Sequence, residues 1–281
     1  MLNLLPFLTK LNDNLQRVNN RLNKYLKDPN EKHIHDIRTA IRRLDAAFTT
    51  LPKNFRNSTP LSDYVMKCKE LFKINSEIRD FDIIYEKLQK YPPNSDRDKI
   101  IEDLKVTRTT RIERAKEIAL PLKNTEISKI LGKIDVKEKD LQKRYSKILS
   151  RLVSKIESTF PIIITDASKI EELHTLRKTC KKLRYMLELL PADNKTTAGQ
   201  ILKMLKKLQD ILGTIHDYDF TIQHLKSVEN PSSQIPSIID AESKERKLKY
   251  EQFVKYCRRR LHIYPDSLLI KIRSPELFID I

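Results

Sequence analysis

The sequence predicts an all-α protein, because its composition and the spacing of its apolar residues both favour long helices. Only 3 of the 281 residues are glycine, whereas Leu, Ile, Lys, Arg and Glu are frequent, as in helical proteins. Apolar residues recur at i, i+3, i+4 and i+7 in segment after segment, and no alternating strand pattern stands before the C-terminal tail. Two motifs also occur twice, in the same order, which indicates two similar halves.

Eight helices are expected, bounded by helix breakers such as "DPN", "YPPNSD" and "ENPSSQIP". Their ranges are 2–27, 31–50, 60–90, 97–131, 137–159, 168–190, 197–228 and 237–261. Three of these segments exceed the usual helix length, which indicates elongated bundles. The tail "IYPDSLLIKIRSPELFIDI" alternates β-branched residues and is expected to form a small strand or an arm.

The internal repeat consists of two motifs at nearly equal offsets. "HDIRTAIRRL" begins at His35, and "HTLRKTCKKL" begins at His174, 139 positions later. "RDFD" from Arg79 matches "HDYD" from His216, 137 positions later. Because order and offset agree, we expect a duplication with four helices in each half and a seam near residue 133. The halves are then 1–133 and 134–262, followed by a tail, 263–281.

The formal charge of +17 predicts an anionic partner, which could be nucleic acid, another polyanion or an acidic membrane surface. Of these, we expect no membrane partner, because the apolar stripes of the helices are needed for the core. The alternative explanation of the positive charge is a general excess of lysine in a protein that has no anionic partner. No apolar run approaches the ~18 residues of a membrane span, and the N-terminus does not resemble a signal peptide. The three cysteines, Cys68, Cys180 and Cys257, lack zinc-ligand spacing and fit a reducing cytosol. We therefore expect a cytoplasmic protein.

Each copy of the first motif places a row of basic side chains beside an apolar stripe of the same helix. At 100° per residue, the stripes are Ile34, Ile37, Ile41, Leu44 and Phe48 in the first copy, and Leu173, Leu176, Cys180, Leu183 and Leu187 in the second. We call the row His35, Arg38 and Arg42 the N-terminal ladder, and the row His174, Arg177, Lys181 and Arg184 the C-terminal ladder. A row beside a buried stripe lies at the lip of a groove between helices, where its electric field is focused.

An ordinary solvated helix face is the competing interpretation of the ladders. Two observations favour binding instead: no acid interrupts 37–44 or 173–187, and each ladder begins with a histidine. Asp45 stands where the second copy has Arg184, so the N-terminal ladder is shorter. Further basic residues could line the same groove or face water; they are Lys203, Lys206 and Lys207, then Arg144, Lys147, Arg151 and Lys155, and finally Arg17, Arg21 and Lys24.

The two ladders, each followed by an (Arg/His)-Asp-aromatic-Asp helix, resemble the CHAD domain, the conserved histidine α-helical domain. The resemblance extends to about residue 262 and implies a single CHAD domain over 1–281. It implies two four-helix bundles related by internal pseudo-twofold symmetry, with a basic groove or pore at their junction that binds inorganic polyphosphate. No β-barrel pattern rich in Glu-x-Glu is present, so the chain resembles a stand-alone member without a CYTH domain.

The resemblance also implies a set of polyphosphate-facing residues, and no cofactor. The implied residues are His35, Arg38, Arg42, Arg43, Arg79, His174, Arg177, Lys178, Lys181, Lys182, Arg184 and His216; from the helix of the second motif we add Lys203, Lys206 and Lys207. Elementary chemistry agrees, because a linear polyphosphate offers charge but no bases, and needs a row of donors rather than stacking platforms. Association with polyphosphate granules in the cytoplasm would follow.

Catalysis and nucleic-acid binding are the other functions considered. The pairs His35–Asp36 and His216–Asp217 resemble fragments of metal-dependent phosphohydrolases, but neighbouring residues on a helix point about 100° apart and cannot converge on one metal ion. Asp80, Asp82, Asp217 and Asp219 are interpreted as orienting basic residues or capping a bend. We therefore expect no catalytic and no metal-binding residues. Nucleic acid bound through its backbone is the main alternative, although aromatic residues do not interleave with the ladders.

Overall fold

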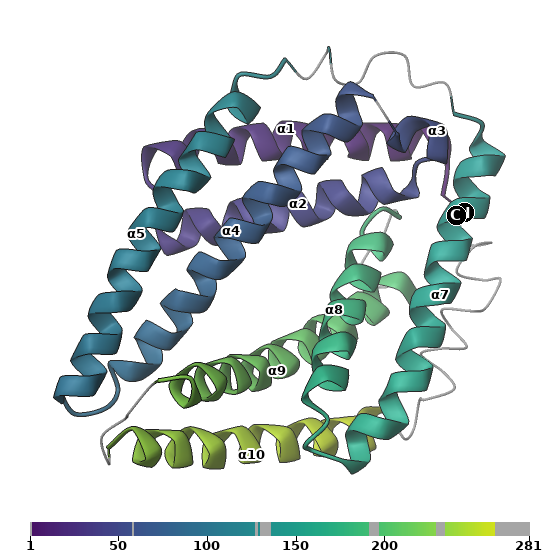
Figure 1. The fold of residues 1–281 in the computed structure, drawn as a ribbon. Helices are drawn as coiled ribbons and strands as arrows, with labels where there is room; N and C mark the ends of the chain where they lie inside the picture. Colours follow the sequence, from purple (N-terminus) through teal and green to yellow (C-terminus); the bar gives the residue numbers. More distant parts are fainter. Residues whose placement is uncertain are drawn as a thin grey trace. The chain divides into compact units, whose positions relative to one another are not determined.

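A computed structural model of the chain describes residues 2–57, 59–126, 129, 136–190, 197–228 and 234–261. These residues form α-helices joined by turns and contain no strand, which confirms the predicted fold class. The helices are α1 (Leu4–Lys27), α2 (Glu31–Thr50), α3 (Lys53–Arg56), α4 (Pro60–Leu88), α5 (Ser95–Lys123), α7 (Glu138–Thr165), α8 (Ile170–Leu187), α9 (Thr197–Lys226) and α10 (Gln234–Leu261). They are drawn in Figure 1.

The chain divides into two compact units, whose boundary lies within α7, between Arg144 and Tyr145. We call Asn3–Arg144 the N-terminal unit and Tyr145–Ile281, which also includes the first two residues, the C-terminal unit. The predicted seam near residue 133 falls outside the described residues, as does the tail after residue 261 for which a strand or arm is expected.

The N-terminal unit is built from two antiparallel helix pairs. α1 packs on α2 and α5, and α4 packs on α2 and α5, so that the four long helices surround one core (Figure 1). The predicted apolar stripe of α2 lies in this core: Ile34, Ile37, Ile41, Leu44 and Phe48 are all buried. Because this stripe faces inward, the N-terminal ladder runs along its edge.

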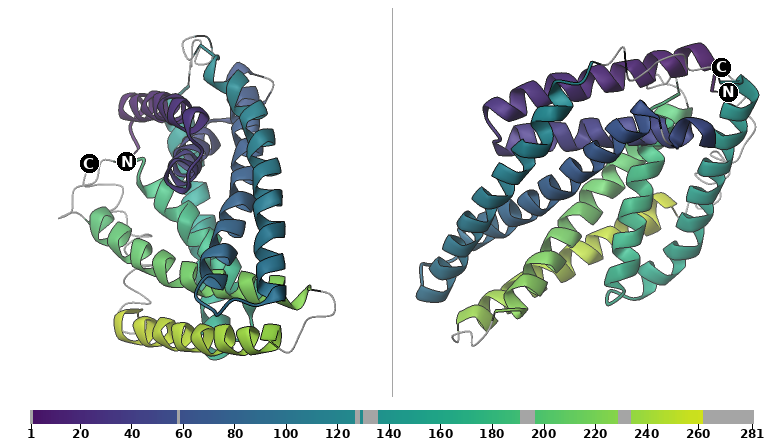
Figure 2. Two further views of the ribbon diagram at one scale, coloured as in Figure 1. Left: turned by 90° about the vertical axis from the view of Figure 1, so that its left-hand side faces the viewer. Right: turned by 45° about the horizontal axis from the view of Figure 1, so that its top comes forward.

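The C-terminal unit contains α7, α8, α9 and α10. α9 packs on both α8 and α10, and α9 and α10 run side by side in both views of Figure 2. Two buried tyrosines connect α7 to the other helices, since the Tyr145 hydroxyl donates to the Met186 carbonyl (3.0 Å) and the Tyr250 hydroxyl donates to the Ile163 carbonyl (2.8 Å). The second predicted stripe, Leu173, Leu176, Cys180, Leu183 and Leu187, is also fully in the core.

Local signals fix where the helices that carry the site begin. The side chain of Asn30 accepts a hydrogen bond from the His33 amide (2.9 Å) and so starts α2. Thr59 and Ser62 form a reciprocal capping box at the start of α4. These caps satisfy amides that would otherwise be orphaned, and they place His35 in the second turn of α2.

Several helix limits differ from those expected. α7 was expected to end at residue 159, before Pro161, but it continues to Thr165. Pro161 removes one helical hydrogen bond, yet Ile163 is fully buried and its carbonyl accepts the Tyr250 hydroxyl, so tertiary contacts hold the turn. The short helix α3 was not expected. Among the described residues, no helix is both long and apolar enough to cross a membrane.

Candidate functional site

The N-terminal ladder lies against an aromatic ring from the neighbouring helix. The guanidinium carbons of Arg38 and Arg42 on α2 lie 5.7 Å and 4.8 Å from the ring centroid of Phe72 on α4. A cation over an aromatic face is attracted by the ring quadrupole. Phe72 therefore holds two of the ladder's cations one turn apart on the same side of α2.

The acidic residues of α2 are bound by cations on the flanking helices. Asp36 pairs with Arg21 on α1 at 2.8 Å, and Asp45 pairs with Lys69 on α4 at 2.7 Å. Asp36 is therefore directed toward α1, and the His35–Asp36 pair does not converge on a common point. Asp45, at the lower end of the N-terminal ladder, is thus paired with a lysine of α4, and its effect on the ladder stays a prediction.

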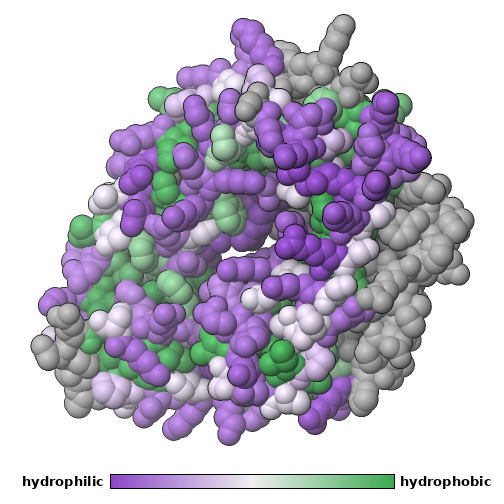
Figure 3. All heavy atoms as spheres, turned by 45° about the vertical axis from the view of Figure 1, so that its right-hand side comes forward, coloured by the Kyte–Doolittle hydropathy of each residue, from purple (hydrophilic) through white to green (hydrophobic). Residues whose placement is uncertain are grey.

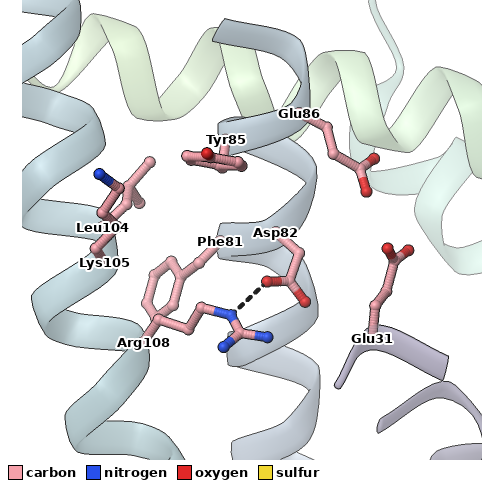
Figure 4. Close-up of a pocket in the computed structure, with 8 residues that line it drawn as sticks. All are labelled: Glu31, Phe81, Asp82, Tyr85, Glu86, Leu104, Lys105 and Arg108. Carbon is pink, nitrogen blue, oxygen red and sulfur yellow. Dashed lines mark hydrogen bonds and ion pairs between the residues drawn. The ribbon is translucent and has the colours of Figure 1, made fainter. Parts of the chain in front are cut away.

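Arg79 on α4, the first residue of the repeated second motif, is held by two carboxylates. It bonds Glu31 at the start of α2, and it also contacts Glu86 on its own helix at 3.4 Å. Figure 4 shows the Glu31 and Glu86 carboxylates pointing toward each other beside a pocket of about 360 Å³. Burial raises the pKa of Glu86, against the effect of Arg79, and the neighbouring Glu31 raises it further. We call Glu31 and Glu86 the acidic clamp.

In the C-terminal unit the corresponding position is a histidine stacked on another histidine. The rings of His174 on α8 and His216 on α9 have centroids 4.6 Å apart and planes inclined by 34°. Phe220, one turn further along α9, meets His216 edge-on at 6.3 Å. Gly213 on α9 lies beside Arg177, whose Nε would be in ordinary van der Waals contact with an added Cβ at 3.9 Å. The first and second motifs are thus in direct contact in this unit.

The cations of both ladders act on the histidines beside them. Burial lowers the pKa of His216 to about 3, and Arg177, His174 and Lys181 lower it too. The pKa of His174 is lowered by burial and then by Lys178, Arg177 and Lys181, against the opposite effect of Glu171. His35 behaves alike: burial lowers its pKa, as do Arg38, Arg42 and Arg79, whereas Asp36 raises it. Burial is thus the main cause of each lowered pKa, and nearby cations oppose protonation of all three imidazoles as well.

One ion pair occurs in both units and was missed by sequence reasoning. Asp82 on α4 accepts from Arg108 on α5 at 2.6 Å (Figure 4), and Asp219 on α9 accepts from Arg246 on α10 at 2.7 Å. The aspartates were interpreted as orienting basic residues, and these two do so, but the partners lie on the next helix and not on a ladder. Arg108 and Arg246 are 138 positions apart, so extending the repeat comparison along the chain would have identified them.

The remaining predicted site residues lie further from the histidines. Arg184 pairs with Glu188 at 3.4 Å and lies over the Tyr185 ring at 4.7 Å. Arg43 and Lys182 follow the ladders by one residue, which turns each side chain about 100° away from Arg42 or Lys181. Lys203, Lys206 and Lys207 are exposed on α9, and helix geometry places Lys207 about 180° from His216. Their role in binding stays a prediction, as do the pseudo-twofold symmetry and the groove at the junction.

Other kinds of site find little support in the described part of the chain. It contains no group of three or more His, Cys, Asp or Glu side chains arranged to hold a metal ion. Cys68, Cys180 and Cys257 are buried free thiols, and burial raises the pKa of each. Hydrophilic side chains cover most of the face shown in Figure 3, and hydrophobic ones appear there in small separate spots. The residues with the most distinctive chemistry are therefore those of the two ladders.

Comparison with known proteins gives one family and one fold. The family model of the CHAD domain matches residues 9–226. The crystal structure of the CHAD domain from the plant Ricinus communis is similar to this chain, with a TM-score of 0.54 and 13% sequence identity, over 96% of this chain and 91% of that one. At this identity the similarity shows a shared fold. The search of curated proteins finds no match.

Proposed function

The chain belongs to the CHAD domain family, as its repeated motifs predicted, and on this premise we propose that it binds inorganic polyphosphate without hydrolysing it. The binding residues of this proposal are those of the two ladders together with Arg79, Lys178 and His216. We also propose that the protein is located in the cytoplasm and associates there with polyphosphate granules. Three buried free cysteines are compatible with that compartment.

The observation that supports the proposal is the gathering of cations around one histidine of each ladder and around His216. Burial lowers the pKa of His35, His174 and His216, and the cations beside them lower it further. Holding like charges close together costs free energy in the free protein. A bound polyanion offsets that cost, and an ordinary solvated helix face has no reason to keep such an arrangement in both halves.

The dimensions and donors of the ladders suit a linear phosphate chain. From His35 to Arg42, and again from His174 to Lys181, the helix rises by roughly 10 Å, at about 1.5 Å per residue. Guanidinium groups offer planar pairs of donors to phosphoryl oxygens, and lysine adds a mobile point charge. The Phe72 ring holds Arg38 and Arg42 before any ligand arrives, which lowers the cost of ordering them.

Competition between two polyanions tests this proposal. Purified protein is titrated with labelled long-chain polyphosphate at fixed salt, and the complex is then challenged with unlabelled polyphosphate or duplex DNA at equal phosphate concentration. We expect polyphosphate to displace the label at much lower concentration than DNA. Equal or better displacement by DNA would instead assign the ladders to nucleic-acid backbones.

Phosphate release tests the non-catalytic part of the proposal. Incubation with polyphosphate or nucleotides and added Mg²⁺ or Mn²⁺ should release no phosphate above the blank. If phosphate is released, and the release is lost when His35 or Asp217 is substituted, the site is catalytic and the proposal is wrong.

A further inference from the structure

The histidines of the two ladders lie where a bound anion and a proton would stabilise each other. His174 and His216 stack at 4.6 Å, from two different helices, and Phe220 closes one side of the pair. His174 and His216 are only partly exposed, whereas His35 is an exposed residue of α2. Two imidazolium ions at this separation would repel each other strongly in a partly buried setting, so the two rings do not both carry a proton in the free protein.

The charged groups around each histidine are mostly cations. His216 faces Arg177 and Lys181 from α8, as well as His174. His174 faces Lys178, Arg177 and Lys181 on α8, opposed by Glu171. His35 faces Arg38 and Arg42 on α2 and Arg79 from α4, opposed by Asp36, which is itself paired with Arg21 on α1. Protonation of any of these imidazoles is therefore opposed by positive charge.

We infer that polyphosphate binding at the ladders is coupled to proton uptake by His35 and by the His174–His216 pair. The inference rests on the proposed function and adds a regulatory property to the same site. A row of phosphates beside the ladders supplies the negative charge that the histidines lack, so the ligand and the proton favour each other's binding. At most one proton is expected on the stacked pair and one on His35.

The direction of the pH dependence follows from linkage. The ligand raises the pKa of the histidines above their values in the free protein, which for His216 is about 3. Affinity is then constant above the pKa of the complex, increases as the pH falls below it, and levels off only below the pKa of the free protein. Each proton taken up strengthens binding by at most about tenfold per pH unit. Internal phosphates of polyphosphate keep their charge throughout this range, so the change belongs to the protein.

Calorimetry measures the coupling directly. Long-chain polyphosphate is titrated into the protein near pH 6, at constant ionic strength, in two buffers with different enthalpies of ionisation. The difference in binding heat gives the number of protons taken up. We expect wild-type protein to take up about one to two protons per ladder pair, and the double variant His174→Gln/His216→Gln to take up clearly fewer while still binding.

His224→Gln provides the matched control. His224 lies on α9 two turns beyond His216, and its pKa is lowered by burial alone. This variant should take up as many protons as wild type. If the double variant does not fold, the imidazole proton resonances of wild-type protein with and without polyphosphate give the same information, and we expect their titration midpoints to rise on binding.

The outcomes separate this inference from the proposed function. Tight polyphosphate binding without proton uptake, or with uptake unchanged in His35→Gln/His174→Gln/His216→Gln, would overturn the coupling and leave the function intact. Absence of polyphosphate binding by wild-type protein at every pH would overturn the function and the coupling together.

Discussion

The Asp219–Arg246 ion pair is the most buried charge pair among the described residues that carry the repeated motif. The two side chains are 11% and 12% exposed, and the arginine Nε lies 2.7 Å from the carboxylate. Arg246 also lies over the Tyr250 ring at 5.9 Å. Burial raises the pKa of Asp219 despite the arginine beside it, which shows how costly this charge is without its partner. In the other unit Arg108 is 32% exposed, so water screens the equivalent pair better.

Removing one partner of this pair should therefore destabilise the fold. We expect Asp219→Ala to lower the free energy of unfolding by about 3–5 kcal/mol, because Arg246 would be left buried and uncompensated. Asp82→Ala should cost less, and Asp219→Leu/Arg246→Leu should recover much of the loss, because no charge then remains. Urea unfolding of the four proteins checks this. Equal, small effects of Asp219→Ala and Asp82→Ala would contradict it.

We expect Phe72 to affect binding through the two arginines that lie over its ring. Phe72→Leu keeps the residue apolar but removes the ring face beneath Arg38 and Arg42. Each lost cation–π contact is worth about 0.5–1 kcal/mol, so polyphosphate affinity should fall several-fold with little change in thermal stability. Phe72→Tyr retains the ring and should bind like wild type. Equal affinity of the leucine and tyrosine variants would show that the ring does not preorganise the ladder.

At the scale of helices, the sequence predicted the features that depend on neighbouring residues of the same helix, namely helix positions and buried faces. Apolar periodicity located the long helices and both buried stripes, because the same residues specify the helix and its inward face. Periodicity missed the last turns of α7, because a proline normally ends a helix. Here the buried Ile163, whose carbonyl accepts the Tyr250 hydroxyl, stabilises the helix beyond Pro161. Periodicity also missed α3, a single helical turn in the connection between two of the expected helices.

The site was predictable only in part for a related reason. All residues of a ladder lie on one helix, so their spacing in the sequence was enough to predict each row. Phe72, Glu31, Arg108 and Arg246 act across helices, and their partners lie 26 to 48 positions away in the chain, whereas Glu86 is 7 positions from Arg79 on the same helix. Such contacts depend on which faces pack together, which periodicity within one helix does not specify. The repeat could have pointed to Arg108 and Arg246, but nothing in the local sequence points to the clamp.

The acidic clamp makes the two units unequal. Arg79 shares its charge with Glu31 and Glu86, whereas the matching His216 is surrounded mainly by cations. We expect Glu31→Gln/Glu86→Gln to release Arg79 for the ligand, to strengthen polyphosphate binding several-fold and to steepen its salt dependence. Glu102→Gln/Glu113→Gln, which removes two acids from i, i+3 pairs on α5, is the control for net charge. If both double variants bind equally well, the clamp has no specific role.

At the scale of the whole molecule, the central claim is that patterned charge at the ladders, and not the net charge of +17, binds the polyanion. Net charge alone would attract any anion in proportion to the number of cations anywhere on the surface. The ladders instead gather cations beside buried stripes in both units, where they repel one another. Removing them should relieve repulsion in the free protein and weaken binding, whereas removing exposed cations elsewhere should do neither.

The most direct measurement compares two variants that lose the same charge. Arg38→Gln/Arg42→Gln/Arg177→Gln/Lys181→Gln alters the ladders, and Lys99→Gln/Arg114→Gln/Lys244→Gln/Lys247→Gln alters exposed residues of α5 and α10. Polyphosphate affinity is measured against salt concentration, together with the melting temperature of the free proteins. Charge-assisted hydrogen bonds are worth roughly 1.5–3 kcal/mol each, without strict additivity.

We predict that the ladder variant loses orders of magnitude in affinity, shows a shallower decline of affinity with salt, and melts at the wild-type temperature or above. The control variant should bind nearly as wild type does. The opposite pattern, in which the ladder variant binds as well as the control but melts at a lower temperature, would mean that these residues are structural ion-pair partners and would contradict the account.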